Sequence, residues 1–164
     1  MTDKSASIHV PPKGTRGARM MDFVFKLMKP FAGREVARYR NASGPEQKLF
    51  MGFPVLILTT VGAKSGLERS TVLGGFPEGD NAWLIIASKG GSPDHPAWLY
   101  NIATNPDKVW IQVGNRKLKV RCESLTGAER EEAYARVASK AKAYAGYPKK
   151  TDREIPVLRL TAAE

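Results

Sequence analysis

Two glycine-rich segments carry the side chains best suited to chemistry, and both suit the binding of an anion. The first, VGAKSGLER, follows an apolar run and holds Lys64, Ser65 and Arg69 around two glycines. The P-loop of nucleoside triphosphatases is excluded, because only one residue separates Gly62 from Lys64 and the pattern G-x-x-x-x-G-K-[ST] is absent. Peptide N–H groups freed by glycine, beside basic and hydroxyl donors, would hold a phosphate. A solvated basic turn is the alternative.

The second segment, ASKGGSPDHPAW, spans residues 87–98 and also ends an apolar run. Ser88 and Lys89 stand directly before Gly90 and Gly91, a pair that would let a ligand approach the main chain closely. The start of a predicted helix near Asp94 adds unpaired N–H donors that favour anions. Taken alone, the segment also fits a plain connection from strand to helix. Two such loops, each at the end of an apolar strand, favour one shared anionic ligand.

Aromatic side chains near these loops and near helix ends indicate that the ligand also has a flat part. Trp98 follows the second loop, and Tyr144 and Tyr147 stand near a helix end in AKAYAGYPKK, among lysines. Tyrosine offers an aromatic face with a polar tip, which suits a flat and partly polar molecule. Burial in the core is the alternative, above all for Trp98.

Other catalytic chemistries find little support in the sequence. The two histidines, His9 and His95, lie far apart, and their spacing indicates neither a Ser-His-Asp arrangement nor a histidine metal site. Cys122 is the one cysteine, which excludes an internal disulfide and a cysteine-cluster metal site. Because it lies in a predicted strand, we expect a buried and inert thiol there. No metal site is expected.

The charge of the chain narrows the class of partner. Its 164 residues suffice for one domain with one core, and its formal net charge is +10. Such a charge favours nucleic acid, an acidic membrane surface or a multiply charged small molecule. Nucleic acid is not expected, because the basic residues do not line one recognition helix and no binding motif appears. No signal peptide and no run approaching about 18 apolar residues occurs, so a cytoplasmic protein is expected.

The periodicity of apolar residues predicts helices separated by strands in hairpins. Residues 1–18 are predicted to form a flexible tail, and residues 19–164 one domain that opens with a basic amphipathic helix over 19–40, kinked at Pro30. After a loop at 41–47, strands are expected at 53–62, on both sides of a turn at 77–81, in a hairpin around 114–116, and at 153–160, where Pro156 suits an edge strand. Two further helices are expected, within 94–106 and over 126–145.

This order of elements predicts a mostly β fold with helices, of the α+β class. Strands joined by tight turns form antiparallel sheets. A small number of twisted strands tends to close into a barrel, because closure removes exposed edges.

Three blocks in this order, LTTVGAKSGLERSTVL, IIASKGGSPDHPAWLYNIATNP and TDREIPVLRL, resemble the deazaflavin-dependent nitroreductase family. These are A-class reductases that use reduced coenzyme F420 and adopt the flavin-reductase-like split β-barrel. The resemblance runs from about Phe53 to Leu160 and implies a split barrel for this chain.

The resemblance also implies which residues bind coenzyme F420. The block G-x-K-[ST]-G-x-x-R would surround its phosphate and acidic tail. The block A-S-K-G-G would follow the deazaflavin ring and its linker with backbone N–H donors, and the block AWLYN would lie beside the cofactor. The residues concerned are Lys64, Ser65 and Arg69; Ser88, Lys89, Gly90 and Gly91; and Trp98 and Asn101.

By the same resemblance the chain is expected to transfer a hydride from reduced F420 to an electron-poor acceptor, such as a quinone, a nitroaromatic compound or an activated C=C bond. The best-known member carries three tyrosines over its substrate. This chain matches two, Tyr144 and Tyr147, and has Ala141 at the third position, which leaves nitroimidazole reduction open. Tyr144 is the expected proton donor or substrate contact. The alternatives are a split-barrel FMN oxidoreductase and a protein that binds the deazaflavin without turnover.

The N-terminal helix has a second interpretation. Residues 1–40 hold nine basic and three acidic residues, +6 of the total charge of +10. A basic helix with methionine and phenylalanine on its apolar face can lie on an anionic bilayer, on the inner face of the cell membrane, where a membrane quinone would be the acceptor. Packing on the barrel or over the active site is the alternative. Split barrels often pair, and the sequence leaves the oligomeric state open.

Overall fold

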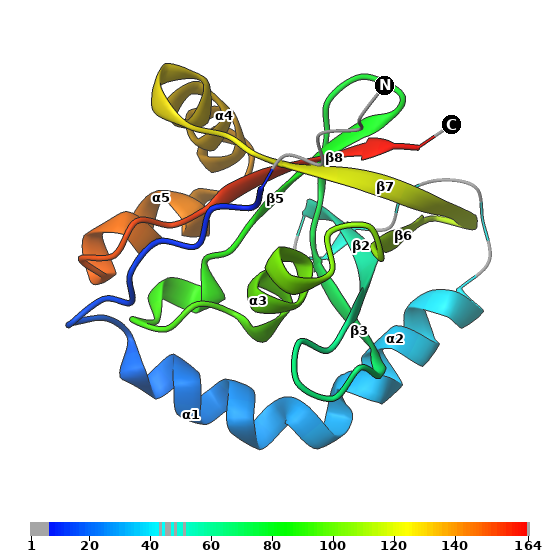
Figure 1. The fold of residues 1–164 in the computed structure, drawn as a ribbon, viewed down its shortest axis with the longest axis horizontal. Coiled ribbons are helices and arrows are strands. Elements are labelled where there is room, and N and C mark those ends of the chain that lie inside the picture. The colour runs from blue at the N-terminus through cyan, green and yellow to red at the C-terminus, as the bar shows by residue number, and fades with distance from the viewer. Residues whose placement is uncertain (1–6, 43, 45–46, 48, 51, 164) are drawn as a thin grey trace.

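The computed structural model describes residues 7–42, 44, 47, 49–50 and 52–163, and Figure 1 shows helices arranged around a curled sheet. The helices are α1 (Arg19–Met28), α2 (Ala32–Asn41), α3 (Ala97–Thr104), α4 (Gly127–Lys140) and α5 (Lys142–Lys150), with 3-10 turns η1 (Lys29–Phe31) and η2 (Lys89–Gly91). The strands are β1 (Leu49–Phe50), β2 (Phe53–Val61), β3 (Glu68–Gly74), β4 (Phe76–Pro77), β5 (Ala82–Ile86), β6 (Trp110–Val113), β7 (Arg116–Ser124) and β8 (Val157–Ala162).

The described strands form one antiparallel sheet of eight, in the order β1-β2-β6-β7-β8-β5-β4, with β3 paired to β2. The sheet curls, so that β3 also approaches β5 and β2 approaches β4. The predicted mostly β fold that closes towards a barrel is therefore confirmed.

One corner of the barrel lies at Gly75, between β3 and β4. β3 pairs with β2, whereas β4 pairs with β5, so the chain changes its partner strand at this residue. The Gly75 N–H donates to the carbonyl oxygen of Pro54, 3.0 Å away. A Cβ on Gly75 would overlap the Leu56 side chain, so the corner requires glycine.

The apolar strands are buried on both faces, which explains their continuous apolar runs. In β5, Trp83 and Ile85 face a core cluster inside the barrel, and Leu84 and Ile86 face a second cluster. α3 contributes Leu99 and Ile102 to the first cluster, and α4 and α5 cover the second. The expected buried thiol is confirmed, because Cys122 lies in the inner cluster and burial raises its pKa to about 12.

The expectation that Pro156 occupies an edge strand is wrong. β8 begins one residue later, at Val157, and lies between β7 and β5 in the sheet. Pro156 can precede a central strand because only its carbonyl is used, which accepts the Ala87 N–H at 2.9 Å.

The single helix expected over 126–145 is two helices, which meet at Ala141 in an extended conformation. The second, α5, contains Pro148, which has no N–H for the carbonyl of Tyr144 four residues earlier. The Tyr134 hydroxyl of α4 donates to this carbonyl at 2.6 Å instead. α4 thereby supplies the hydrogen bond that α5 lacks.

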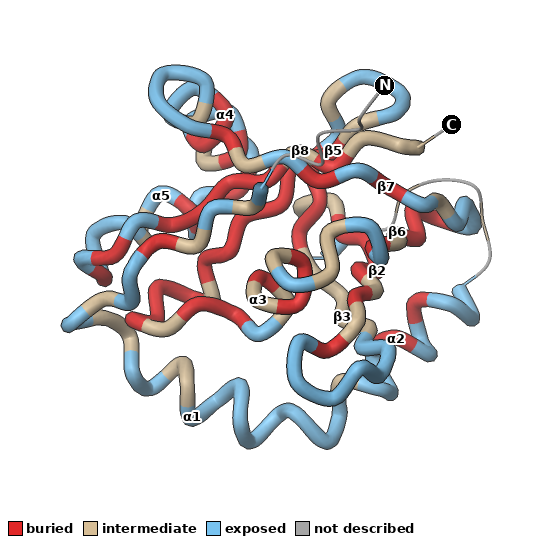
Figure 2. The backbone as a smooth tube through the Cα atoms, in the orientation of Figure 1, coloured by how far each residue is buried: buried red, intermediate tan, exposed pale blue. Residues whose placement is uncertain are grey.

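The expected kink at Pro30 is confirmed, because η1 separates α1 from α2 there. α2 packs Val36 and Tyr39 on the barrel. α1 buries no residue completely, and most of it is exposed in Figure 2, with Met21 and Asp22 half-buried. Residues 7–18 form neither helix nor strand. They lie along the segment after β5, where Gly14 and Ala18 donate N–H groups to the carbonyls of Pro93 and Gly91, each at 2.9 Å. Whether this segment is flexible stays a prediction.

Candidate functional site

The loop between β2 and β3 holds Lys64 and Ser65 in a closed turn. The Gly62 N–H donates to Leu67 (2.8 Å), and the Gly66 N–H donates to Gly62 (2.9 Å). The Ser65 hydroxyl accepts the Leu67 N–H at 3.2 Å and occupies the space that a Cβ on Gly62 would need. Ser65 therefore shapes the loop, while the exposed Lys64 side chain extends from it.

Arg69 leads from this loop into a basic groove. It stands near the start of β3, and a hollow of about 540 Å³ lies between this strand and η1 with α2. The wall of the hollow includes three cations, Lys29, Arg40 and Arg69, against one carboxylate, Glu68. Such a groove suits a chain of negative charges.

The segment after β5 forms a concave backbone surface of the kind that binds anions. Ser88 has right-handed helical angles (φ −80°, ψ −36°), and Lys89 follows with φ 42° in the left-handed region. Successive N–H groups converge in this αR-αL arrangement, which is called a nest. The N–H groups of Ser88, Lys89 and Gly90 donate no hydrogen bond to any other described residue. Gly90 and Gly91 continue with φ 64° and 85°, conformations that favour glycine.

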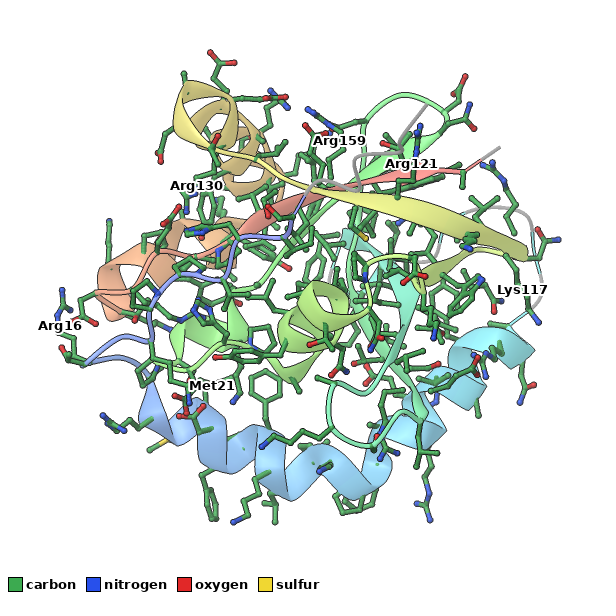
Figure 3. All side chains as sticks on the ribbon, viewed as in Figure 1. Arg16, Met21, Lys117, Arg121, Arg130 and Arg159 are labelled. Carbon is green, nitrogen blue, oxygen red and sulfur yellow. The ribbon has the colours of Figure 1, made fainter. Side chains whose placement is uncertain are left out.

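α1 contacts this nest through its first turns. The Lys89 ammonium lies 3.2 Å from the Asp22 carboxylate, and the Ser92 hydroxyl donates to the same carboxylate. Burial opposes ionisation of Asp22, but the Ser92 hydrogen bond and the Lys89 charge outweigh it and lower the pKa of this carboxyl. The Met21 side chain lies over Gly90, on the side of α1 that faces η2 in Figure 3.

α3 connects the two loops through Asn101. The Asn101 carbonyl oxygen Oδ1 accepts the Ala63 N–H at 3.0 Å, and its Nδ2 donates to the buried Thr60 hydroxyl at 3.1 Å. Trp98, one turn earlier on α3, is half-buried against the inner core cluster. The structure therefore places Asn101 as the anchor of the Lys64 loop.

The two tyrosines of α5 lie in different surroundings. Tyr144 is buried, with edge contacts to Phe53 and Phe76 at ring distances of 6.2 and 5.6 Å, and burial raises its pKa. Tyr147 is half-buried, and the Lys150 ammonium lies 5.7 Å from its ring centre. Because Lys150 also packs where a Cβ on Gly91 would sit, the Tyr147 face of α5 adjoins the nest.

Two residues of this region were missed by sequence reasoning. Asp22 forms an ion pair with Lys89. In the sequence, Asp22 stood out only as an acidic residue on a basic helix. Arg153 is buried between α5 and β8, and donates to the carbonyls of Ala87, Ser88 and Ser92. The pattern in the sequence that could have indicated Arg153 is a charged residue directly before the apolar strand that closes the chain.

A second, smaller hollow of about 280 Å³ lies elsewhere, between the β4–β5 turn and α4. Its wall includes Phe76, Glu78 and Arg136 and contains none of the predicted site residues. The groove and the nest are therefore the better candidates.

Comparisons with known proteins identify the family of the chain. The family model of the F420H(2)-dependent quinone reductases matches residues 32–162. An F420H(2)-dependent quinone reductase of Mycobacterium tuberculosis (strain ATCC 25618 / H37Rv) is 38% identical over 131 residues, which cover 76% of this chain and 85% of the relative.

Two solved structures share the fold. One, described as an F420-H2 dependent reductase (FDR-A), has a TM-score of 0.59 at 39% identity and covers 65% of this chain and 93% of its own. Another, described as a domain-swapped dimer, has a TM-score of 0.62 at 32% identity and covers 85% and 97%. The chain thus belongs to the family of F420H(2)-dependent quinone reductases, which confirms the predicted kinship, split-barrel fold, oxidoreductase class and coenzyme F420, and makes the FMN alternative unnecessary.

Proposed function

We propose that this chain reduces a quinone with coenzyme F420 held between the Lys64 loop and the Ser88–Gly91 nest. The observation that carries the proposal is the nest, which has three convergent N–H groups that donate to no other described residue. The basic groove at Arg69 supports it. The donor set fits the cofactor, which is a multiply charged anion with a flat ring. Lys64 and Arg69 would hold its phosphate and acidic tail, and Ser88, Lys89, Gly90 and Gly91 would hold its ring and linker.

The residues of this chain bind and orient the cofactor and the acceptor, and they stabilise negative charge. When bound in its reduced form, the cofactor supplies a hydride from its deazaflavin ring. The Lys89 ammonium and the nest N–H groups favour negative charge at the site. Trp98 and Asn101 would support the sides of the cofactor site. Asn101 would act by holding the Lys64 loop in place. Besides the hydride, the quinone needs one proton, from water or from a tyrosine, to become a hydroquinone.

We propose Tyr147 as the residue of the tyrosine pair that meets the acceptor, and Tyr144 as its support from the core. Tyr147→Phe is expected to lower kcat for quinone reduction about tenfold or more, because a positioned acid contributes on this scale. Tyr144→Phe keeps the ring contacts and should lower kcat less. Steady-state kinetics with a soluble quinone checks this order; a larger loss in Tyr144→Phe would return the donor role to Tyr144.

The cofactor site is tested by Lys64→Ala and Arg69→Ala. Both variants are expected to raise KM for reduced F420 about tenfold or more while changing kcat little, because charge-assisted hydrogen bonds to phosphate contribute roughly 1.5–3 kcal/mol each. Arg121→Ala on β7 is the control, since it removes an exposed cation on the side of the sheet opposite α1 in Figure 3.

Equal KM values in Lys64→Ala, Arg69→Ala and Arg121→Ala would contradict the phosphate role. Tight F420 binding by the wild type without quinone reduction would leave the protein a deazaflavin binder instead.

We also propose that α1 and η1 contact an anionic membrane surface. Met20, Phe23 and Leu27 recur on one side of α1 and are 78%, 65% and 61% exposed, with Lys26 and Lys29 beside them. Exposed apolar side chains next to cations suit the headgroup region. None of the described helices has the length and apolar run needed to cross a bilayer.

Co-sedimentation with vesicles tests this contact. The wild type is expected to sediment with phosphatidylglycerol vesicles at low salt, and the double variant Phe23→Ser, Leu27→Ser to stay in the supernatant. Zwitterionic vesicles are the control for charge. Identical sedimentation of both proteins would remove the membrane from the proposal.

A further inference from the structure

We infer that Arg153 is a positioning residue that shapes and polarises the anion-binding nest at Ser88–Gly90. The inference rests on the proposed function, since it assigns a role in F420 binding to a residue that lies behind the nest.

Arg153 is a buried cation surrounded by neutral acceptors. Its side chain is 6% exposed, and it forms no ion pair with any described carboxylate. Nε donates to the Ser92 carbonyl at 2.8 Å, and Nη2 donates to the carbonyls of Ala87 and Ser88 at 3.1 and 2.9 Å. Burial lowers the pKa of this guanidinium, yet arginine stays charged at neutral pH. A buried charge needs such hydrogen bonds to be tolerated.

The direction in which these carbonyls point decides where the N–H groups of the nest point. In a trans peptide the C=O and the following N–H point to opposite sides of the chain. No cis peptide occurs among the described residues. Because the carbonyls of Ala87 and Ser88 point to Arg153, the N–H groups of Ser88 and Lys89 point away from it. These are two of the three N–H groups of the nest.

The same two peptide units carry the effect of the charge. A cation bound to a carbonyl oxygen draws electron density from its peptide and strengthens the N–H as a donor. Arg153 thus stabilises an anionic group on the opposite side of the nest without touching it. Because Arg153 occupies the carbonyl side of these peptides, it does not occupy the side to which the N–H groups point.

His95 holds the guanidinium from the other side. Nη1 of Arg153 lies 3.1 Å from His95 Nδ1, and His95 Nε2 lies 2.7 Å from the Pro11 carbonyl. Since arginine can only donate, Nδ1 accepts and Nε2 carries the proton that is donated to Pro11. Burial and the Arg153 charge both lower the pKa of His95, which fits this neutral form, although the Pro11 hydrogen bond opposes them.

The planar guanidinium of arginine can donate to acceptors in several directions at once. A lysine ammonium keeps the charge, but it cannot bind Ser92, Ser88 and His95 in one geometry. We therefore expect Arg153→Lys to bind F420 better than Arg153→Gln and less well than the wild type.

The test measures F420 binding, stability and the spectrum of the bound cofactor in full-length variants. Arg153→Gln is expected to raise the Kd for F420 tenfold or more and to shift the absorption band of the bound oxidised cofactor. Arg159→Gln is the matched control, since Arg159 on the next strand is partly buried and binds Glu78 at 2.7 Å, outside the nest. It is expected to lower the unfolding temperature while keeping the Kd within about twofold.

Three outcomes are decisive. In the first, Arg153→Gln has the Kd and spectrum of the wild type, whereas the nest variant Gly90→Ala has a raised Kd. This result would overturn the role of Arg153 and leave the proposed site standing. Wild-type binding in both variants would overturn the proposed site. Loss of binding that follows the fall in stability equally in Arg153→Gln and Arg159→Gln would reduce Arg153 to a structural role.

A further measurement needs no variant. The backbone amide resonances of Ser88, Lys89 and Gly90 should shift when F420 is added to wild-type protein. Unchanged resonances would overturn the inference together with the proposed site, even if Arg153→Gln does not fold.

Discussion

Replacing Asn101 by alanine is expected to lower both stability and cofactor affinity, because one amide holds the Lys64 loop on α3. The change leaves the buried Thr60 hydroxyl without its donor and frees the Ala63 N–H. An unpaired buried group costs about 1–3 kcal/mol. The released loop should raise KM for reduced F420 at least about tenfold, equivalent to ~1.4 kcal/mol. Urea unfolding and steady-state kinetics measure the two effects.

Asn101→Asp separates the two effects. The carboxylate still accepts the Ala63 N–H and can accept the Thr60 hydroxyl, so stability should fall less than in Asn101→Ala. The new negative charge beside the loop repels an anionic cofactor, so KM should rise at least as much. Asn105→Ala is the control, because Asn105 directly follows α3 and donates to the Val61 carbonyl, 3.3 Å away. A KM as high in Asn105→Ala would show that any weakening of α3 disturbs the site.

The sequence predicted the strands and loops well because their signals are local. Apolar runs closed by glycine marked β2 and β5, and the residues Lys64 and Lys89 after them do lie on two loops that α3 connects. The residues that sequence reasoning missed act through distant partners. Asp22 reaches Lys89 from another helix, and Arg153 reaches Ser88 from a point 65 residues later in the chain. No local pattern records such contacts.

The expectations that the structure contradicts also rested on local sequence patterns. Pro156 suggested an edge strand because proline removes a ladder donor, but β8 begins after it and uses its carbonyl. The break at Ala141 was missed because the residues on both sides have helical propensity. Tyr144 is a different case, because the resemblance implied its place over the substrate and its ring lies in the second core cluster. Its predicted catalytic role awaits the comparison with Tyr147.

The family match begins at residue 32, so α1 and Asp22 lie outside it. The contact of Asp22 with Lys89 therefore joins a residue outside the matched region to one inside it. It places a carboxylate on a cation that the proposed function assigns to the cofactor. An anionic ligand at the nest would compete with Asp22 for Lys89.

The hydrogen bond from Tyr134 to the Tyr144 carbonyl is expected to stabilise the protein by about 1–3 kcal/mol, because it satisfies the buried acceptor that Pro148 leaves unpaired. Burial raises the pKa of Tyr134 to about 12, so the hydroxyl keeps its proton. Tyr134→Phe removes the donor, and Pro148→Ala restores a main-chain N–H. In urea unfolding, Tyr134→Phe should therefore cost about 1 kcal/mol less in the Pro148→Ala background. Additive effects would show that Tyr134 stabilises α5 by packing alone.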